Sequence, residues 1–312
     1  MSSSLDNKLI LVTGGTGTIG RQVVRELLTE GARIIVYSRD QNKQFKMNHD
    51  HESSRIVYKN GDILDPQILS RAMKDVDYVV HAAAAKHVPL CETNADNAIR
   101  VNVEGTRNVL STSARWGVKK VLHISTDKAV NPTSVMGATK FLAERLVKEY
   151  SRILPCSIIR LGNVFASNGS VVPTFQDRIK NNLPLVVNNP AATRYFITIK
   201  EAGKFIVDRL KDMEGGEIYV KKMKVMTIMS LAEVMSPKVG YPIEIGDMTP
   251  GEKLKEMLIT QDESRLAYDE GEFITVGGKT IGLKNIDPKV EFFTKEEIKE
   301  MLDEIFVRSA VL

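Results

Sequence analysis

A glycine-rich loop directly after the first apolar run is the feature that most constrains this chain. The loop Thr13-Gly-Gly-Thr-Gly-Thr-Ile-Gly20 follows the apolar run Leu9–Thr13 and opens an amphipathic stretch from Ile19 to Glu30. It fits both Gly15-x-Gly17-x-x-Gly20 and Gly14-x-x-Gly17-x-x-Gly20. Glycines at these spacings let the backbone turn tightly around a pyrophosphate, whose charge the following helix N-terminus favours. The strand–loop–helix context therefore predicts a dinucleotide-binding unit.

The first half of the 312-residue chain alternates short apolar runs with amphipathic stretches. Apolar strands separated by helices predict an α/β fold, a Rossmann-type doubly wound parallel sheet covered on both faces. Beyond residue 163 the pattern becomes irregular and prolines recur. We expect a Rossmann domain over residues 1–162 and a smaller substrate-binding region over 163–312, partly interleaved with it. The expected strands are Leu9–Thr13, Arg33–Ser38, Arg55–Tyr58, Tyr78–Ala82, Lys120–Ser125 and Ser157–Gly162, with helices over Asn94–Trp116 and Val135–Ser151.

Composition disfavours several classes of protein. The 43 basic and 39 acidic residues leave a formal charge of +4 without a block of like charges, which argues against a nucleic-acid partner. Apolar runs fall short of the ~18 residues that span a bilayer, and the polar start Met1–Lys8 lacks an apolar signal core. Cys91 and Cys156 stand apart, without metal-ligand spacing, so we expect buried thiols, no metal site and a cytoplasmic location.

Residues at the end of the second strand indicate the cofactor. An arginine there suits the 2′-phosphate of NADP, whereas an acidic residue accepts from the 2′-hydroxyl of NAD. Ser38 and Arg39 precede Asp40, and Lys43 follows, so NADP is favoured over NAD. Asp62 is a candidate either for the adenine amine or for a turn cap. The candidate cofactor-binding residues are Gly14, Gly15, Thr16, Gly17, Thr18, Ile19, Gly20, Ser38, Arg39, Lys43, Asp62, Ile63, Ala82, Ala83, Ala84, Asn102 and Lys140.

The densest polar cluster, Ile124–Lys140, follows the expected fifth strand. It falls at the carboxyl edge of the sheet, where open α/β folds bind ligands. Asp127 and Lys128 place an acid beside a base, a pair suited to moving two protons in one reaction. Met136 and Lys140, four residues apart at a helix start, share one helix face. These residues are the catalytic candidates.

Eight segments in order carry a resemblance to a known family. They are His81–Pro89, Ser125–Ala129, Met136–Lys140, Arg160–Asn163, Gly169–Pro173, Thr193–Phe196, Gly215–Tyr219 and Pro250–Lys253. With the glycine loop, they make the chain resemble the extended short-chain dehydrogenase/reductases from about residue 8 to 265. Within that family it is most similar to the UDP-N-acetylglucosamine 4,6-dehydratases of glycan biosynthesis.

The resemblance implies a cycle in which NADP takes hydride from C4 of the hexose, water leaves across C5 and C6, and the hydride returns to C6. It implies that Thr126 binds the C4 oxygen and that Lys140 holds the nicotinamide ribose. Asp127 would protonate the leaving C6 hydroxyl, and Lys128, if neutral, would take the C5 proton. Met136 departs from the tyrosine of most relatives, although one active branch resembles this sequence in carrying methionine. The C4 base is then Asp127, Thr126 or a water near Lys140, and the C5 configuration of the product stays open.

A UDP-sugar needs cations and amides to bind its diphosphate and uracil. Arg194 suits a bidentate phosphate contact, and by resemblance Asn163 contacts the diphosphate or N-acetyl group. The remaining candidates are Ser170 and Val171 over the nucleotide, Glu252 at the ribose, and Lys86 at the sugar or a subunit contact. We expect a homo-oligomer that binds a small-molecule UDP-sugar.

Two other functions compete with a dehydratase. A UDP-sugar 4-epimerase also oxidises C4, but it needs no elimination pair such as Asp127 and Lys128. A non-catalytic NADP-binding protein is suggested by Met136, which cannot do acid–base chemistry.

Overall fold

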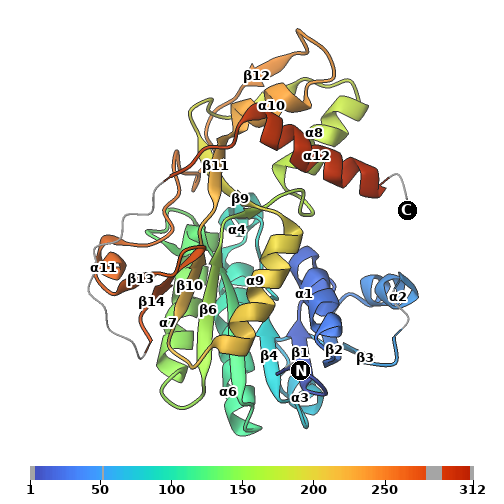
Figure 1. Ribbon diagram of the computed structural model, residues 1–312, viewed down its shortest axis with the longest axis vertical. Coiled ribbons are helices and arrows are strands. Elements are labelled where there is room, and N and C mark those ends of the chain that lie inside the picture. Colours follow the sequence, from blue (N-terminus) through green and yellow to red (C-terminus); the bar gives the residue numbers. More distant parts are fainter. Residues whose placement is uncertain (1–3, 51–52, 279–289, 310–312) are drawn as a thin grey trace.

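The computed structural model describes residues 4–50, 53–278 and 290–309, and it places a large α/β sheet beneath a smaller upper part (Figure 1). In the described part of the chain the main sheet has nine strands in the order β13-β14-β10-β6-β5-β4-β1-β2-β3. Strands β1 to β6 and β10 run parallel, whereas β14 runs antiparallel to its two neighbours, β10 and β13. The strand order reverses between β1 and β4, which is where such sheets bind ligands. The strands are β1 (Leu9–Thr13), β2 (Arg33–Ser38), β3 (Ile56–Asn60), β4 (Tyr78–His81), β5 (Lys120–Thr126), β6 (Cys156–Leu161), β10 (Ile218–Lys221), β13 (Ala267–Asp269) and β14 (Phe273–Val276).

Helices cover both faces of this sheet, and each face has its own core. Alternate strand residues point to opposite faces, so Val79 and Val121 pack into one core while Val80 and Leu122 pack into the other. Helices α1 (Thr18–Thr29) and α9 (Ile199–Asp212) pack together on one face. On the other lie α3 (Pro66–Ala72), α6 (Gly105–Arg115) and α7 (Val135–Tyr150), with α4 (Val88–Thr93) beside α7. Helix α2 (Gln41–Asp50) lies near β3 on the α1 side, since its Met47 packs into the same core as α1. The predicted Rossmann-type fold is confirmed.

The helix expected over Asn94–Trp116 differs from the prediction. It consists of α5 (Ala95–Ile99), a π-helical turn Arg100–Glu104 and α6. The wide turn carries Asn102, whose amide donates to the Ala85 carbonyl and whose oxygen accepts from the Ala85 N–H. Such bulges occur often at functional sites, and here the bulge fixes the segment after β4.

The upper part is more regular than its sequence suggested. It holds β7 (Asn163–Val164), β9 (Thr193–Ile197) and β11 (Lys224–Thr227) in one sheet, and β8 (Leu185–Val187) and β12 (Ile243–Ile245) in another. Helices α8 (Val171–Lys180), α10 (Ile228–Met235) and α12 (Lys295–Ser309) enclose a core with Phe175, Leu231 and Ile298. Pro173 lies in the first turn of α8, where its missing N–H costs no hydrogen bond. The proline was therefore compatible with a helix.

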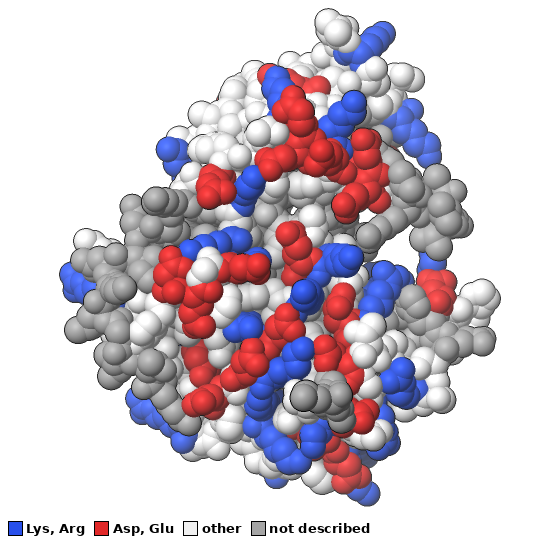
Figure 2. Space-filling model, in the orientation of Figure 1, with Lys and Arg blue, Asp and Glu red and all other residues white. Residues whose placement is uncertain are grey.

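Residues beyond 162 serve both parts of the molecule. Strands β10, β13 and β14 belong to the main sheet, and α9 covers it, while a short helix α11 (Gln261–Ser264) precedes β13. Acidic and basic side chains are interspersed over the face shown in Figure 2. Among the residues that the structure describes, none of the helices has both the length and the apolar character needed to cross a membrane.

Candidate active site

A cavity of about 940 Å³ lies at the carboxyl ends of the parallel strands, between the main sheet and the upper part. The cavity is lined by predicted residues of all three kinds: catalytic, cofactor-binding and substrate-binding. Gly15, Asn102 and Asp127 lie behind the wall instead. The predicted residues that line the cavity are Gly14, Thr16, Gly17, Thr18, Ile19, Gly20, Ser38, Arg39, Lys43, Asp62, Ile63, Ala82, Ala83, Ala84, Lys86, Thr126, Lys128, Met136, Lys140, Asn163, Ser170, Val171, Arg194 and Glu252.

The backbone around the glycine loop is packed too tightly for a side chain at Gly14, Gly15 or Gly20. Gly14 has φ +64°, and a Cβ there would lie 2.8 Å from the Ala83 Cα. A Cβ on Gly20 would lie 2.3 Å from the Gly14 carbonyl oxygen. Gly15 packs against β1 and β2, since its Cβ would meet the Val12 carbonyl oxygen at 3.0 Å. The loop therefore leaves a cradle at the N-terminus of α1 that fits a dinucleotide pyrophosphate.

Two exposed cations lie at the end of β2. Arg39 Nη1 is 3.4 Å from Asp62 Oδ2, and Lys43 Nζ is 3.1 Å from Asp40 Oδ2. Hydrogen bonds from Lys43 lower the pKa of Asp40, so that carboxylate is ionised and already partnered. Exposed ion pairs contribute little, and either cation can turn to a phosphate at small cost.

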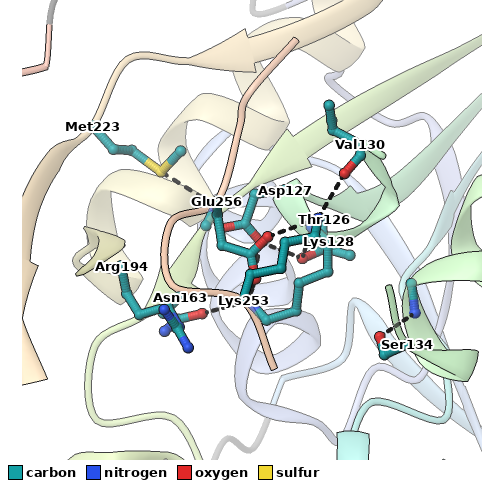
Figure 3. A network of polar contacts seen from close by, with 12 residues as sticks. Thr126, Asp127, Lys128, Val130, Ser134, Asn163, Arg194, Met223, Lys253 and Glu256 are labelled. Atoms are coloured by element: carbon teal, nitrogen blue, oxygen red, sulfur yellow. Dashed lines mark hydrogen bonds and ion pairs between the residues drawn. The ribbon is translucent and has the colours of Figure 1, made fainter. Parts of the chain in front are cut away.

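The acid–base pair follows β5 in a short 3₁₀ turn, Asp127–Ala129 (Figure 3). Asp127 is fully buried, and its Oδ1 accepts from Thr126 Oγ1 at 2.9 Å and from Lys128 Nζ at 3.1 Å. Its Oδ2 is buried without a hydrogen-bond partner. Lys128 Nζ also donates to Asn163 Oδ1 at 2.9 Å. Because Thr126 and Lys128 line the cavity, they connect Asp127 to it.

Lys140 lies one turn after Met136 on α7, and both side chains reach the cavity. Its Nζ donates to the Ile124 carbonyl oxygen at 2.6 Å and lies 3.0 Å from His123 Nε2. Burial lowers the pKa of Lys140 to about 8, although Glu144 on the next turn opposes that shift. Lys140 is therefore close to losing its proton near neutral pH.

His123 is a site residue that the sequence reasoning missed. Its ring lies 5.1 Å from that of His81, the residue opposite it on β4. Thr106 Oγ1 donates to the Asn102 carbonyl, so His81 Nε2 donates to Thr106 Oγ1 and Nδ1 accepts from Thr13 Oγ1. Burial and the charge of Lys140 lower the pKa of His81 to about 3 and that of His123 well below its usual value. The amine of Lys140 therefore contacts the neutral ring of His123, and the neutral ring of His81 lies behind it.

A second missed feature is the segment 249–263, which we call the strap. Its carboxylates form ion pairs with arginines on strands of two sheets. Glu252 Oε1 is 3.0 Å from Arg194 Nη2, and Glu263 Oε2 is 2.7 Å from Arg160 Nη1. Between them, Glu256 reaches Lys128. The motif Pro250–Lys253 pointed to Glu252 alone, because the partners of the strap lie far away in the sequence.

Several polar groups line the end of the cavity that we expect to hold the nucleotide. Ser170 caps α8 by position, but its Oγ is buried without a partner. Lys86 Nζ donates to the Asn168 carbonyl oxygen at 2.7 Å, and burial and the charge of Lys43 lower the pKa of Lys86. Asn188 Nδ2 donates to Glu252 Oε2 at 2.9 Å, which holds Glu252 beside Arg194. These groups can bind an anion and hydroxyls.

The chain is similar over most of its length to a known protein family, to several curated proteins and to a solved structure. Residues 10–277 match the family model described as polysaccharide biosynthesis protein. An uncharacterised membrane protein of Methanocaldococcus jannaschii is 40% identical over 98% of each chain. A UDP-N-acetylglucosamine 4,6-dehydratase (inverting) of Campylobacter jejuni is 38% identical over 92% of this chain and 87% of its own. A UDP-glucose 4-epimerase of Rickettsia canadensis is 33% identical over 86% and 83%. The solved structure of Pen from Bacillus thuringiensis has a TM-score of 0.89 at 32% identity, covering 96% of this chain and 98% of its own.

Proposed function

Because the chain belongs to the polysaccharide biosynthesis protein family, within the extended short-chain dehydrogenase/reductases, we propose that it converts UDP-N-acetylglucosamine to a UDP-2-acetamido-2,6-dideoxy-hexos-4-ulose. It is a nucleotide-sugar dehydratase. The observation that carries the specific reaction is the contact between Asp127 and Lys128 at the cavity beside Lys140. An elimination needs both an acid and a base, and this pair supplies them at one place.

The residues divide the proton transfers between them. NADP, when bound, accepts the C4 hydride and returns it to C6. Neutral Lys128 takes the C5 proton, and the electron pair of the C5–H bond expels the C6 hydroxyl, which leaves as water with a proton from Asp127. Asp127 is buried, so we propose that its proton reaches the sugar through Thr126 Oγ1. We propose that the proton of the C4 hydroxyl passes through Thr126 Oγ1 to Asp127, which later gives it to the leaving C6 hydroxyl. Met136 cannot take this proton.

The cradle and the cations of β2 support NADP as the cofactor. The glycine loop accommodates the pyrophosphate, and Arg39 and Lys43 offer charge to a 2′-phosphate. Asp40, the residue that would favour NAD, is held by Lys43. Lys140 can donate to the nicotinamide ribose.

The upper part supports a UDP-sugar as the substrate. The N-terminus of α8, with the unpartnered hydroxyl of Ser170, favours a phosphate. Arg194 is 7% exposed at the side chain and can present its guanidinium to the same diphosphate. Glu252 accepts hydrogen bonds, as a ribose contact requires, and Asn163 holds Lys128 at the sugar end.

Product mass tests this proposal directly. The purified protein is incubated with NADP and UDP-N-acetylglucosamine, and loss of one water is expected. An unchanged mass with altered stereochemistry at C4 would indicate an epimerase instead, and cofactor binding without turnover of any UDP-hexose would exclude both enzymes. Lys128→Ala is expected to retain cofactor binding and to form no product. Deuterium incorporation from solvent, followed by NMR, assigns the C5 configuration.

A further inference from the structure

Glu256 lies beside the proposed catalytic lysine without reaching the cavity. It is 8% exposed, and its Oε1 is 3.9 Å from Lys128 Nζ (Figure 3). Its Oε2 is 3.1 Å from Lys253 Nζ, but the geometry makes no hydrogen bond. Lys253 Nζ donates instead to the Val130 carbonyl oxygen at 2.8 Å. A buried carboxylate thus faces two lysines and is hydrogen-bonded to neither.

This arrangement acts on the protonation of Lys128. An ammonium has three N–H donors, and in Lys128 two are directed to Asp127 Oδ1 and Asn163 Oδ1. The third can serve Glu256 or a substrate. The charged groups that face Lys128 are Asp127 from its own turn and Glu256 and Lys253 from the strap. Lys140 on α7 lines the same cavity, while Arg194 on β9 is paired with Glu252.

We propose that Glu256 is a positioning residue that strengthens Lys128 as the C5 base. When Lys128 Nζ binds the C5 proton, an ammonium forms between two carboxylates, and the charge of Glu256 favours it. Lys253 partly neutralises Glu256 and so limits this effect. Since Glu256 lies outside the cavity wall, it acts through Lys128 and not on the sugar. The inference rests on the proposed role of Lys128.

Two substitutions test the inference, because they are expected to shift the protonation of Lys128 in opposite directions. Glu256→Gln removes the negative charge, so Lys128 remains neutral to lower pH but is a weaker base. Two unit charges 4 Å apart interact by about 1 kcal/mol even in bulk water, which corresponds to about one pH unit. Lys253→Met removes the cation that partly neutralises Glu256, so the pH at which half of Lys128 is neutral is expected to rise. Glu256→Asp, which keeps the charge, is expected to restore most of the wild-type behaviour.

The primary measurement does not depend on activity. Lys128 is acylated with acetic anhydride across a pH series, and the modified peptide is quantified by mass spectrometry. Glu256→Gln is expected to move the labelling midpoint of Lys128 down by about one pH unit, with the acid limb of the kcat profile moving in parallel and KM for the UDP-sugar unchanged. An unmoved midpoint in Glu256→Gln, or equal loss of activity at every pH, overturns the inference. A shifted midpoint in a protein that does not dehydrate the sugar would show that Glu256 acts on Lys128, but it would refute the proposed function and the role of Lys128 as the C5 base.

Discussion

Replacing Arg160 by methionine tests how strongly the strap is anchored to the main sheet. Arg160 on β6 is 2% exposed and binds two carboxylates. Its Nε and Nη2 donate to Glu144 at 2.9 and 2.7 Å, and its Nη1 and Nη2 donate to Glu263 at 2.7 and 2.8 Å. Ser125 Oγ also donates to Glu144 at 2.6 Å. One guanidinium therefore holds α7, β6 and the strap together.

The size of the effect follows from what the substitution leaves behind. Methionine fills much of the space but leaves the buried Glu144 and the partly buried Glu263 without their cation. Breaking a buried pair in this way costs about 3–5 kcal/mol. At about 2 °C per kcal/mol for a chain of this size, the thermal midpoint is expected to fall by about 6–10 °C at pH 7.

The loss is also expected to depend on pH. Burial acts to raise the pKa of Glu263, but the hydrogen bonds and charge of Arg160 outweigh it and hold that pKa below its usual value. The wild-type pair therefore contributes stability above the unfolded pKa of the carboxyl, and this is lost as pH falls through the folded pKa. Without Arg160, only the Thr260 N–H and the charge of Lys148 still oppose the effect of burial, so the pKa of Glu263 rises and protonation is favoured. The gap between variant and wild type should narrow as pH falls from 7 toward 4.

Thermal denaturation followed by circular dichroism provides the measurement. Arg265→Met is a matched control, because Arg265 lies 3.6 Å from Asp262 in the adjacent short helix with both side chains exposed. An exposed pair contributes about 0–1 kcal/mol, so its midpoint should stay within about 2 °C of wild type. If Arg160→Met behaved like the control, the buried network would not be what anchors the strap.

Three further outcomes are expected. Gly20→Ala should abolish cofactor binding measured by calorimetry, because its Cβ would lie 2.3 Å from the Gly14 carbonyl oxygen; binding within tenfold of wild type would contradict this. Lys140→Met should abolish turnover yet stabilise the protein by about 1–2 kcal/mol at pH 7. Burial lowers the pKa of Lys140 from 10.5 to about 8, a penalty of about 3 kcal/mol, and loss of the hydrogen bond to the Ile124 carbonyl offsets about 1–2 kcal/mol of the gain. That penalty is complete below pH 8 and is relieved as pH rises toward 10.5, so the gain seen in denaturation curves should shrink over that range. Arg39→Ala should weaken NADP binding about tenfold or more and leave NAD binding unchanged; equal losses for both would show that Arg39 does not contact the 2′-phosphate.

The parts of the fold that could be predicted are those determined by local sequence. Strands β1 and β2 have the predicted bounds, because each is an uninterrupted apolar run between polar ends. The glycine loop was recognisable because its spacing and its strand–helix context occur together. Helix α8 was not predicted, because the recurring prolines beyond residue 163 made the pattern irregular, although Pro173 stands in the first turn of the helix.

The parts that could not be predicted depend on distant contacts. Arg160 and Glu263 are 103 residues apart, and Arg194 and Glu252 are 58 apart, so no local pattern pairs them. His123 resembled any polar residue in a buried strand, because its contact with Lys140 appears only when α7 packs on β5. Asp127 was expected at the sugar, but its burial beneath Thr126 and Lys128 could be seen only in three dimensions.

The path of the chain between the two parts has a consequence for how such enzymes can diversify. The chain leaves the main sheet after β6, returns for α9 and β10, leaves again for β11, α10 and β12, and returns for β13 and β14 (Figure 1). Genetic recombination at residue 162 would therefore remove three strands from the sheet together with the upper part. The two insertions, β7 to β9 and β11 to β12, pair with each other, because β11 lies beside β9 and β12 lies beside β8. New sugar specificities are therefore acquired by changing both insertions together. Each begins and ends at the main sheet, so the pair can be replaced while the cofactor cradle stays intact.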